Sequence, residues 1–386
     1  MFRIRTLAVL FLVGFFAAVP LRAQIGKTVI VSAGSEVDHQ LNDINAATDP
    51  AAKIKLIDAF AAAHPEGDLQ ILADEQYVNY YLTAKQYDKV FEYGDKLFAL
   101  DPDSFSNAVN MVRAANEKGD TDRLFAAGEK ASGVLQRFKA QPPPAGTSPE
   151  AWKADQQQKL ESAKDDRNYI EQSLMNAAYQ QKDAAKKAAL LVRFANLFPD
   201  SPNTGQALSA AAVTYQQAQN RPKMIETANI ALAKDPDNLG ILLLLADDYS
   251  EKGEQLDKAE AYAKKAAALC DTAKKPEGVS DADWQKQINL QKGLALSALG
   301  QIDLQKKLNA AAVDSLTKAA PLLKSSAAVY ARNQYRLGFA YLNLKNTAGA
   351  KQAFTDAASV DSPYKGLAQD KLKGIAAAKA PAKKAS

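Results

Sequence analysis

Prolines that close helix-patterned segments recur at a fixed interval along this chain. Pro65 and Pro102 lie 37 residues apart, and the same interval separates Pro199 from Pro236. Each follows an apolar run with helical periodicity, and proline ends a helix because it lacks a backbone N–H and clashes with the preceding turn. A repeat of roughly 20 to 50 residues indicates units that bury their apolar faces against their neighbours. The sequence therefore predicts a repeat architecture.

Two amphipathic runs separated by a short polar break make up each unit. In one unit the runs cover 72–82 and 87–100, with Ala84-Lys85-Gln86 between them. This pattern predicts a helix-turn-helix of about 34 residues. We count about eight such units, at 34–67, 71–104, 105–138, 168–201, 205–238, 239–275, 281–329 and 331–364.

Small and large residues alternate within a unit in a characteristic way. The clearest set is Leu337, Gly338 and Tyr341 on a first helix, followed by Ala350, Phe354 and Ala357 on a second. The small residues allow the helices to approach closely, and the large ones fill the space beside them. This pattern resembles the tetratricopeptide repeat (TPR) family. The resemblance implies an all-α helix-turn-helix solenoid wound as a right-handed superhelix.

The chain is expected to divide into segments of distinct composition. They are a signal peptide at 1–23, an extended segment at 24–33, N-terminal TPR-like repeats at 34–138, a Pro-rich loop at 139–149, a long helix with the C-terminal repeats at 150–364, and the last helix end with a disordered Lys/Ala tail at 365–386. Three consecutive prolines, Pro142 to Pro144, prevent a helix in the loop, which we expect to join two halves of the array.

Residues 1–23 have the composition of a secretory signal. Arg3 and Arg5 precede an apolar stretch at 6–19, and Ala23 ends a segment suited to cleavage. This stretch is shorter than the ~20 residues with which a helix crosses a bilayer, which favours a cleaved signal over a membrane anchor. We expect export to the periplasm or the cell exterior, with cleavage at Ala23 or a few residues away.

The positive charge of the chain is concentrated at its two ends. The net charge is +4, but residues 1–23 hold three arginines and no acid, and residues 365–386 hold six lysines against one aspartate, which leaves residues 24–364 at −4. A nucleic-acid surface needs clustered basic residues on a basic domain. We therefore expect no nucleic-acid partner. The tail predicts at most weak contact with anionic envelope polymer or lipid.

A second internal similarity contains both tryptophans of the chain. The spacing PxGxSxxxW is shared by Pro144, Gly146, Ser148 and Trp152 and by Pro276, Gly278, Ser280 and Trp284. Ser148 and Ser280 are suited to cap the start of a helix, Pro149 is tolerated at a first helical position, and Asp283 can complete a capping box. We favour this structural interpretation, with a packed Trp at the start of a long helix, over an aromatic ligand platform.

Residues that carry chemistry are scarce. The sequence contains no GxSxG, no HExxH and no phosphate-binding glycine loop. Cys270 is the only cysteine, and His39 and His64 are the only histidines, which rules out an internal disulfide and the usual zinc sites. We expect no catalytic residue, cofactor or metal. Cys270 is predicted to be a buried small hydrophobe and His64 to end a helix.

In the resembled family, the first helix of each pair lines a concave groove. The residues that this places in the groove are Asn79, Asn110, Arg113, Asn116, Gln172, Asn176 and Tyr179, with Glu75, Leu82 and Val109 beside them. The spacings i, i+4 and i+7 put each set on one stripe of its helix. Amide groups can pair with the backbone of a bound peptide, while Tyr and Arg add contact area. The alternative is that these are merely exposed polar positions.

Some members of the family bind a peptide's terminal carboxylate with two asparagines and a set of basic residues. Asn79 and Asn110 match the two asparagines. Glu75, Tyr169 and Ser173 stand where cations are needed, so that clamp is not expected.

Three functions remain in competition. The first is a non-enzymatic scaffold or adaptor of the cell envelope that binds protein segments in its groove. The second is a structural or assembly component that contacts cell wall or membrane through its basic tail. An enzyme is the least favoured of the three. The sequence names neither the partner nor the process.

Overall fold

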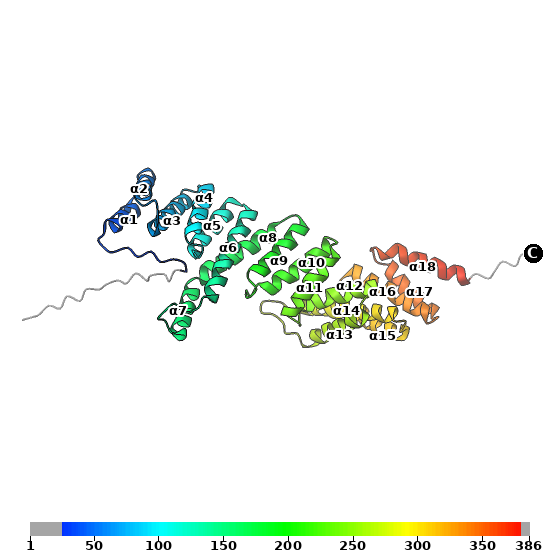
Figure 1. Ribbon diagram of the computed structural model, residues 1–386. Helices are drawn as coiled ribbons and strands as arrows, with labels where there is room; N and C mark the ends of the chain where they lie inside the picture. Colours follow the sequence, from blue (N-terminus) through cyan, green and yellow to red (C-terminus); the bar gives the residue numbers. More distant parts are fainter. Residues whose placement is uncertain (1–24, 380–386) are drawn as a thin grey trace, which may run out of the picture. The chain divides into compact units, whose positions relative to one another are not determined.

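Eighteen helices joined by short turns make up residues 25–379, the part of the chain that the computed structural model describes (Figure 1). No strand occurs among those residues. This confirms the prediction of an all-α array of helix pairs. The predicted signal at residues 1–23 lies outside the described residues. None of the described helices is both long enough and apolar enough to cross a membrane.

The described residues form two compact units. Unit 1 comprises residues up to Gln180 together with 196–198, and unit 2 comprises 181–195 and the residues from Pro199 onward. Unit 1 contains α1 (Glu36–Ala46), α2 (Pro50–Ala63), α3 (Asp68–Thr83), α4 (Tyr87–Leu100), α5 (Phe105–Lys118), α6 (Thr121–Ala140), α7 (Pro149–Ser162) and α8 (Lys164–Gln180).

Unit 2 begins with most of α9 (Ala184–Leu197), whose last two residues count with unit 1. It continues with α10 (Thr204–Gln217), α11 (Arg221–Lys234), α12 (Leu239–Lys252), α13 (Leu256–Thr272), α14 (Asp281–Gln305), α15 (Asn309–Leu322), α16 (Ala327–Asn343), α17 (Thr347–Ala358) and α18 (Tyr364–Lys379). The Pro-rich segment joins α6 to α7, and both helices belong to unit 1.

Consecutive helices pack as pairs within each unit. In unit 1 the pairs are α1/α2, α3/α4 and α5/α6, and in unit 2 they are α10/α11, α12/α13, α14/α15 and α16/α17. Their bounds coincide with seven of the predicted repeats, and α8 and α9 occupy the predicted unit at 168–201. Two described helices stand outside this count: α7, which is inserted before α8, and α18, which follows the last pair.

Side-chain caps define where many of the helices begin. The Ser104 hydroxyl accepts from the Asn107 amide, and the Asp120 carboxylate accepts from the Arg123 amide. Each bond satisfies a backbone donor that the first turn of a helix leaves without a partner. At the other end of α5, Gly119 takes the left-handed conformation with φ of 72°, which glycine adopts without a steric penalty.

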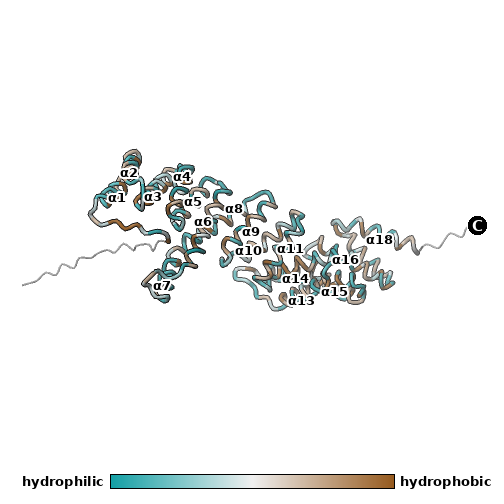
Figure 2. Tube along the Cα trace, viewed as in Figure 1, coloured by the Kyte–Doolittle hydropathy of each residue, from teal (hydrophilic) through white to brown (hydrophobic). Residues whose placement is uncertain are grey.

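The core of unit 1 starts between its first two pairs. Ile44, Ile57 and Phe60 are buried against Tyr77, whose hydroxyl donates to the Asp58 carboxylate at 2.7 Å. Burial and this hydrogen bond raise the pKa of Tyr77. Hydrophobic and hydrophilic residues are interspersed along the helices, and most helices bury one apolar face, whereas α7 has no buried residue (Figure 2).

Buried amides fix neighbouring pairs to one another in both units. In unit 1 the Asn107 side chain donates to the Gly94 carbonyl at 2.8 Å, and in unit 2 the Asn333 side chain donates to the Leu316 carbonyl at 2.9 Å. Each bond runs from a first helix to the second helix of the preceding pair. Burying an amide is costly unless it is hydrogen-bonded, so these contacts set the register between pairs.

The extended segment before α1 lies against the second and third pairs of unit 1. Ile25 is buried, and its carbonyl accepts from the Phe105 amide at 3.1 Å. The Lys27 amide donates to the Asp101 carboxylate at 2.9 Å, and the Lys27 ammonium contacts Asp68 at 2.6 Å. The segment thus satisfies polar groups in the turn between α4 and α5.

The duplicated PxGxSxxxW motif forms the same turn and cap twice. Ser148 accepts from the Ala151 amide and Ser280 from the Asp283 amide, both at 3.1 Å. Gly146 and Gly278 have φ of 82° and 79°. The capping interpretation is confirmed, although the Asp283 carboxylate accepts from the Ser280 hydroxyl at 2.7 Å where a capping box would use the backbone amide.

The two helices that follow this motif differ in length. α14 runs for 25 residues, as a long helix would, whereas α7 has 14 residues and ends at Ser162. The break before α8 is confined to Ala163, whose amide still donates to the Lys159 carbonyl and whose carbonyl accepts from the Arg167 amide. The long helix predicted after Trp152 is therefore interrupted at one residue.

Candidate functional site

The seven predicted groove residues lie on three first helices of unit 1. Asn79 is on α3, Asn110, Arg113 and Asn116 are on α5, and Gln172, Asn176 and Tyr179 are on α8. We call this set the amide face. Asn110 is half-buried, and the other six are exposed. The structure brings α3 next to α5 and α5 next to α8.

Asn79 and Asn110 of the amide face are hydrogen-bonded to each other. The Asn110 side-chain nitrogen donates to the Asn79 Oδ1 at 3.2 Å. Together they line a cavity of about 230 Å³, which also includes Glu75, Ser106 and the buried Asn107. The pair therefore links two consecutive repeats across a small polar opening.

Arg113 and Asn116 connect α5 to α8. Arg113 contacts the Asp166 carboxylate at 2.9 Å, and its guanidinium lies 5.5 Å from the centre of the Tyr169 ring. Asn116 donates to the Tyr169 hydroxyl at 3.3 Å. Tyr169 is thus part of the same surface. From the sequence it was noted only because it stands where the carboxylate clamp of the family needs a cation. Its position three residues before Gln172 was the available signal.

Gln172, Asn176 and Tyr179 continue the stripe along α8. Tyr179 is 38% exposed, which is high for so large a side chain. Val109, which was expected beside Asn110 on this face, is instead buried in the core. The expectation was wrong because eight of the 14 residues of α5 are buried, so the buried arc of this helix is wider than the spacing alone indicates.

A second cavity adjoins the first through Asn79. It has a volume of about 360 Å³ and lies between the α1–α2 turn and α3. Tyr80 and Pro50 provide apolar walls, while Lys53 and Gln76 provide polar ones. Asn79 lines both cavities, so they form neighbouring depressions along one side of unit 1.

Unit 2 carries a polar cluster on its own first helices that the sequence analysis missed. Arg336 on α16 is only 6% exposed and contacts the Glu251 carboxylate on α12. Arg332 contacts Asp247 at 3.0 Å. Burial lowers the pKa of the Arg336 guanidinium, and Asp247 opposes that shift. The sequence does contain a signal for this cluster, because Asp247 and Glu251 lie four residues apart on one helix and Arg332 and Arg336 lie four apart on another.

Beside this cluster lies a cavity of about 320 Å³ with aromatic walls. Tyr335, Phe339 and Tyr364 line it together with Arg336 and Glu251. The Tyr335 ring lies 5.0 Å from Phe339 and 5.5 Å from Tyr364, measured between ring centroids. Lys371 of α18 lies 4.8 Å from the Phe339 ring. The Lys371 ammonium group of the chain itself therefore already contacts one of these aromatic rings.

His64 and Cys270 take structural positions. His64 ends α2, and its Nε2 lies 3.2 Å from the Gln40 Oε1. Cys270 is buried, as predicted, and burial next to Asp271 raises the pKa of its thiol to about 11. Within residues 25–379 no three His, Cys, Asp or Glu side chains are grouped as they would be to hold a metal ion.

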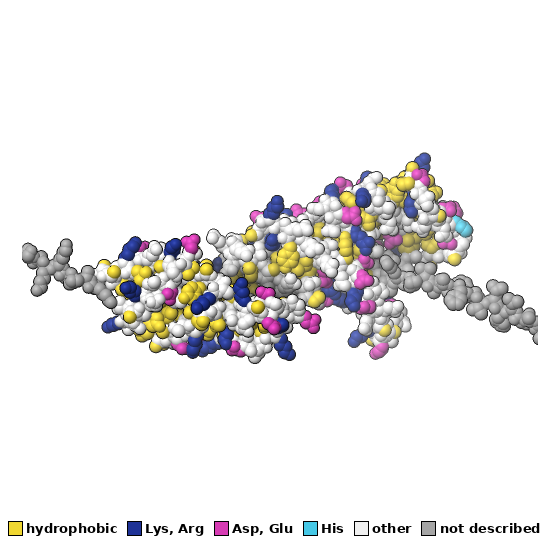
Figure 3. Space-filling view, turned by 180° about the vertical axis from the view of Figure 1, so that it is seen from behind, with side chains coloured by type: hydrophobic (Ala, Val, Ile, Leu, Met, Phe, Trp, Pro, Cys, Tyr) yellow, Lys and Arg dark blue, Asp and Glu magenta, His cyan; other side chains and the backbone are white. Residues whose placement is uncertain are grey.

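Charged side chains of both signs are interspersed on the face that Figure 3 draws. Several ion pairs join consecutive repeats of unit 1, such as Lys118 with Asp88 at 2.5 Å and Arg137 with Asp103 at 2.8 Å. Exposed pairs of this kind contribute little each. Their regular recurrence nevertheless follows the repeat of the fold.

Comparison with known proteins gives similarity in fold alone. No protein-family model and no curated protein matches the sequence. Among solved structures, the APC/C hetero-tetramer Cut9–Hcn1 matches 88% of this chain at 12% identity with a TM-score of 0.41, and this chain spans 54% of that one.

Two further solved structures are matched over most of their own length. Yeast Tom70 matches 89% of this chain and 95% of its own, with 12% identity and a TM-score of 0.34. The TPR domain of P58(IPK) matches 89% and 99%, with 13% identity and a TM-score of 0.27. The chain itself, with its packed helix pairs, has a TPR-like helical architecture.

Proposed function

We propose that this protein is a non-enzymatic scaffold that binds a segment of another protein along the amide face of unit 1. The observation that carries the proposal is the continuous run of hydrogen-bonding side chains across three first helices. It begins at the Asn79–Asn110 pair and passes through Arg113 and Asn116 to α8. TPR-like architecture is typical of proteins that bind other proteins, which supports this general role.

The chemistry of the amide face suits the backbone of a bound segment. Each carboxamide has two N–H donors and an oxygen acceptor. The Asn79–Asn110 bond uses one donor of Asn110 and one lone pair of Asn79, so both side chains keep donors and acceptors for a ligand. Amides placed at successive repeats can pair with successive peptide groups, which gives binding that depends on backbone more than on sequence.

The two cavities that share Asn79 offer places for side chains of the segment. The larger one has the Tyr80 ring and Pro50 in its walls, so it suits an apolar group. Energy in such interfaces concentrates in a few Tyr, Trp and Arg contacts. Arg113 and Tyr179 are therefore the expected anchors, and the affinity should be on the order of micromolar.

The test uses the protein from residue 24 onward to capture partners, which are identified by mass spectrometry and then purified. Binding of a purified partner is measured by calorimetry against a variant with Asn79, Asn110, Arg113 and Tyr179 changed to Ala. We expect the variant to lose at least about tenfold in affinity. A photoreactive phenylalanine analogue placed at Asn176 should cross-link to the same partner.

A matched control carries Asn42→Ala, Tyr87→Ala and Arg137→Ala, which change the same residue types outside the amide face of unit 1. The control should bind like the unchanged protein, and both variants should melt as cooperatively as it does. If the amide-face variant keeps its fold and its full affinity, the binding surface lies elsewhere and the proposal fails. Retention that disappears when the lysine tail is removed would instead favour the assembly role.

We further propose that this scaffold works in the cell envelope after export. The support is the Arg-flanked apolar run at 6–19 and the cleavage segment that ends at Ala23. Mass spectrometry of the protein from its native host should find a chain that begins near residue 24. An intact Met1 terminus in the soluble cytoplasmic fraction would contradict export.

A further inference from the structure

The cavity between the α1–α2 turn and α3 of unit 1 contains a single charged side chain. This cavity, with a volume of about 360 Å³, is the one that adjoins the amide face through Asn79. Lys53 of α2 is the only Lys, Arg, Asp or Glu among the residues that line it. We call it the Lys53 cavity. A cation with no acid beside it makes the cavity complementary to a negatively charged group.

Lys53 has no ion-pair partner within residues 25–379. No hydrogen bond or ion pair joins its ammonium group to another residue of that range, and the residue is half-buried. By contrast, Lys118 and Lys130 of the same unit each contact an acid of α4 at 2.5 Å. A cation that is partly removed from water is stabilised when it acquires a charged hydrogen-bond partner. A carboxylate from outside the chain would supply that partner.

Helix stability does not explain why Lys53 stands where it does. α2 begins at Pro50, and the Asp49 carboxylate accepts from the Ala52 amide at 2.8 Å. The start of a helix is the positive end of its dipole, where an acid is stabilising and a lysine is not. The Asp49 cap offsets part of this positive potential but forms no ion pair with Lys53. An anion bound in the cavity would offset the rest.

The walls of the Lys53 cavity add hydrogen-bond donors that suit a carboxylate. The Asn79 Oδ1 accepts from Asn110 at 3.2 Å, so both N–H donors of the Asn79 amide remain for a ligand. Asn45 and Gln76 contribute further carboxamides. The Tyr80 ring provides apolar surface for the methylene groups of the same ligand side chain.

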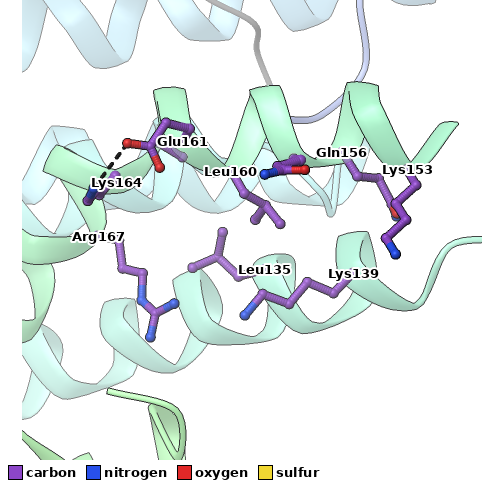
Figure 4. Close-up of a pocket in the computed structure, with 10 residues that line it drawn as sticks. Leu135, Lys139, Lys153, Gln156, Leu160, Glu161, Lys164 and Arg167 are labelled. Atoms are coloured by element: carbon purple, nitrogen blue, oxygen red, sulfur yellow. Dashed lines mark hydrogen bonds and ion pairs between the residues drawn. The ribbon is translucent and has the colours of Figure 1, made fainter. Parts of the chain in front are cut away.

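The pocket beneath α7 differs from the Lys53 cavity in this respect. It lies between α6, α7 and the start of α8 and has a volume of about 480 Å³ (Figure 4). Glu161 pairs there with Lys164 at 3.0 Å. Arg167 contacts the buried Glu171 at 2.7 Å, and Lys139 also interacts within the chain. Most charged side chains of this pocket therefore already have partners, so charge does not single out a ligand for it.

We propose that the Lys53 cavity binds an acidic side chain of the segment that lies along the amide face. The carboxylate contacts the Lys53 ammonium group and accepts from the Asn79 amide. This rests on the proposed function of the amide face and adds that the segment carries Asp or Glu where it passes α2. The contact is distinct from the terminal-carboxylate clamp, because Lys53 belongs to a second helix and the acid is a side chain within the segment.

The experiment uses an array of decapeptides with amidated ends, in which one position is fixed and the others are mixtures. The full chain from residue 24 should be retained at least about tenfold more by pools fixed as Asp or Glu at one position than by pools fixed as Asn or Gln there. The best single peptide of the acidic pools should bind with a Kd on the order of micromolar, measured by fluorescence anisotropy. Lys53→Gln should weaken that binding at least about tenfold, and Lys53→Arg should preserve it.

Lys55→Gln is the matched control. Lys55 is exposed, belongs to the same helix and does not line the cavity, so its change should leave binding unaltered. Both Gln variants should melt like the unchanged protein. A peptide with Gln in place of its acid should bind the unchanged protein at least about tenfold more weakly, yet bind the Lys53→Gln variant as well as the acidic peptide does. An equal preference for the acid with and without Lys53 would overturn the proposal.

A variant with Asn110, Arg113 and Tyr179 changed to Ala tests the amide face separately. It should weaken binding of the acidic peptide and of its Gln counterpart by the same factor, because the Lys53 cavity is intact. Binding that depends on this face but shows no preference for an acid would overturn the Lys53 contact and leave the proposed function standing. Failure of every pool to bind would overturn both.

Chemical labelling of amines gives a second readout at the site. The bound acidic peptide should protect Lys53 from an N-hydroxysuccinimide ester and leave Lys55 reactive, which mass spectrometry of the labelled chain measures. The Gln peptide with a free C-terminal carboxylate serves as the comparison. If it binds as tightly as the acidic peptide and protects Lys53 equally, the cavity recognises a chain end, which would also overturn the proposal.

Discussion

Gly338 of α16 lies directly against the ring of Phe354 on α17. A Cβ built on Gly338 would stand 2.6 Å from the Phe354 Cε1 and 2.7 Å from its Cζ. Phe354 is fully buried and also contacts Tyr335 and Phe339 edge-on, so its ring has no room to withdraw. The absence of one side chain is what lets this helix pair close.

The first prediction is that Gly338→Ala destabilises unit 2. The added methyl group must displace the Phe354 ring or separate α16 from α17, and such overpacking costs about 1–3 kcal/mol. Urea unfolding followed by circular dichroism measures the loss. The control is Gly374→Ala in α18, where nothing lies within 4 Å of the new Cβ. That change should be neutral or stabilising by up to about 1 kcal/mol. Equal effects of both changes would contradict the packing argument.

The second prediction concerns Asp74, a buried carboxyl on α3 whose Oδ2 has no hydrogen-bond partner within the described residues. Burial raises its pKa from 3.8 to about 6, although Lys96 partly offsets the shift. Between about pH 4 and about pH 6 the unfolded chain loses this proton before the folded one does. Stability should therefore fall as pH rises through that window.

Asp74→Asn tests this dependence. The variant should gain stability relative to the unchanged protein as pH increases from 4 to 8, by at most about 3 kcal/mol. Chemical denaturation at several pH values gives the difference directly. Asp43→Asn, at an exposed position of α1, serves as the control for the removal of a carboxylate. A difference that does not vary with pH would refute the assignment.

The third prediction separates the two copies of the capping motif. Ser280→Ala removes the cap of α14, which packs against α13 and α15, and should lower the stability of unit 2 by about 1 kcal/mol. Ser148→Ala removes the same bond from α7, which buries no side chain. Its effect should be faster amide hydrogen exchange within α7 with little change in global stability. A large global loss from Ser148→Ala would show that α7 is integral to the core.

The fourth prediction is that Cys270 is nearly inert in the folded protein. With its thiol pKa raised to about 11, the thiolate fraction at pH 8 falls on the order of 100-fold below that of an unperturbed cysteine. A chromogenic disulfide reagent should react slowly with the native chain and rapidly in urea. Similar rates in both conditions would mean that the thiol is neither buried nor perturbed.

Much of the architecture could be predicted from local pattern. The proline interval located the helix pairs, and Ser148 and Ser280 were recognisable as caps because capping depends on residues only three positions away. Local pattern fails where tertiary packing decides. No Gly or Pro marks the break at Ala163 in the sequence. The break occurs because α7 packs against α6 and does not continue along the axis of α8.

The candidate surfaces also divide into features that local pattern predicts and features that tertiary packing determines. Helical spacing predicts that Asn110, Arg113 and Asn116 form one stripe. It does not predict which residues of the neighbouring helices they contact. Val109 shows where helical spacing is insufficient. It is rotated by about 100° from Asn110, and the apolar residues around it did not decide whether it faces the core or the groove. The pocket beneath α7 could not be anticipated, because it depends on a helix outside the repeat.

The contact between Arg336 and Glu251 has a consequence for the order in which unit 2 is completed during synthesis. These residues lie 85 positions apart, as do Arg332 and Asp247, whereas most other polar links between helices of the unit span fewer than 60. At ribosomal speeds of roughly 5 to 20 residues per second, Asp247 and Glu251 of α12 are synthesised roughly 4 to 17 s before Arg332 and Arg336. During that interval Asp247 and Glu251 form a negative patch on the growing chain, and a factor that binds the nascent chain there meets a charge that the arginines of α16 later compensate.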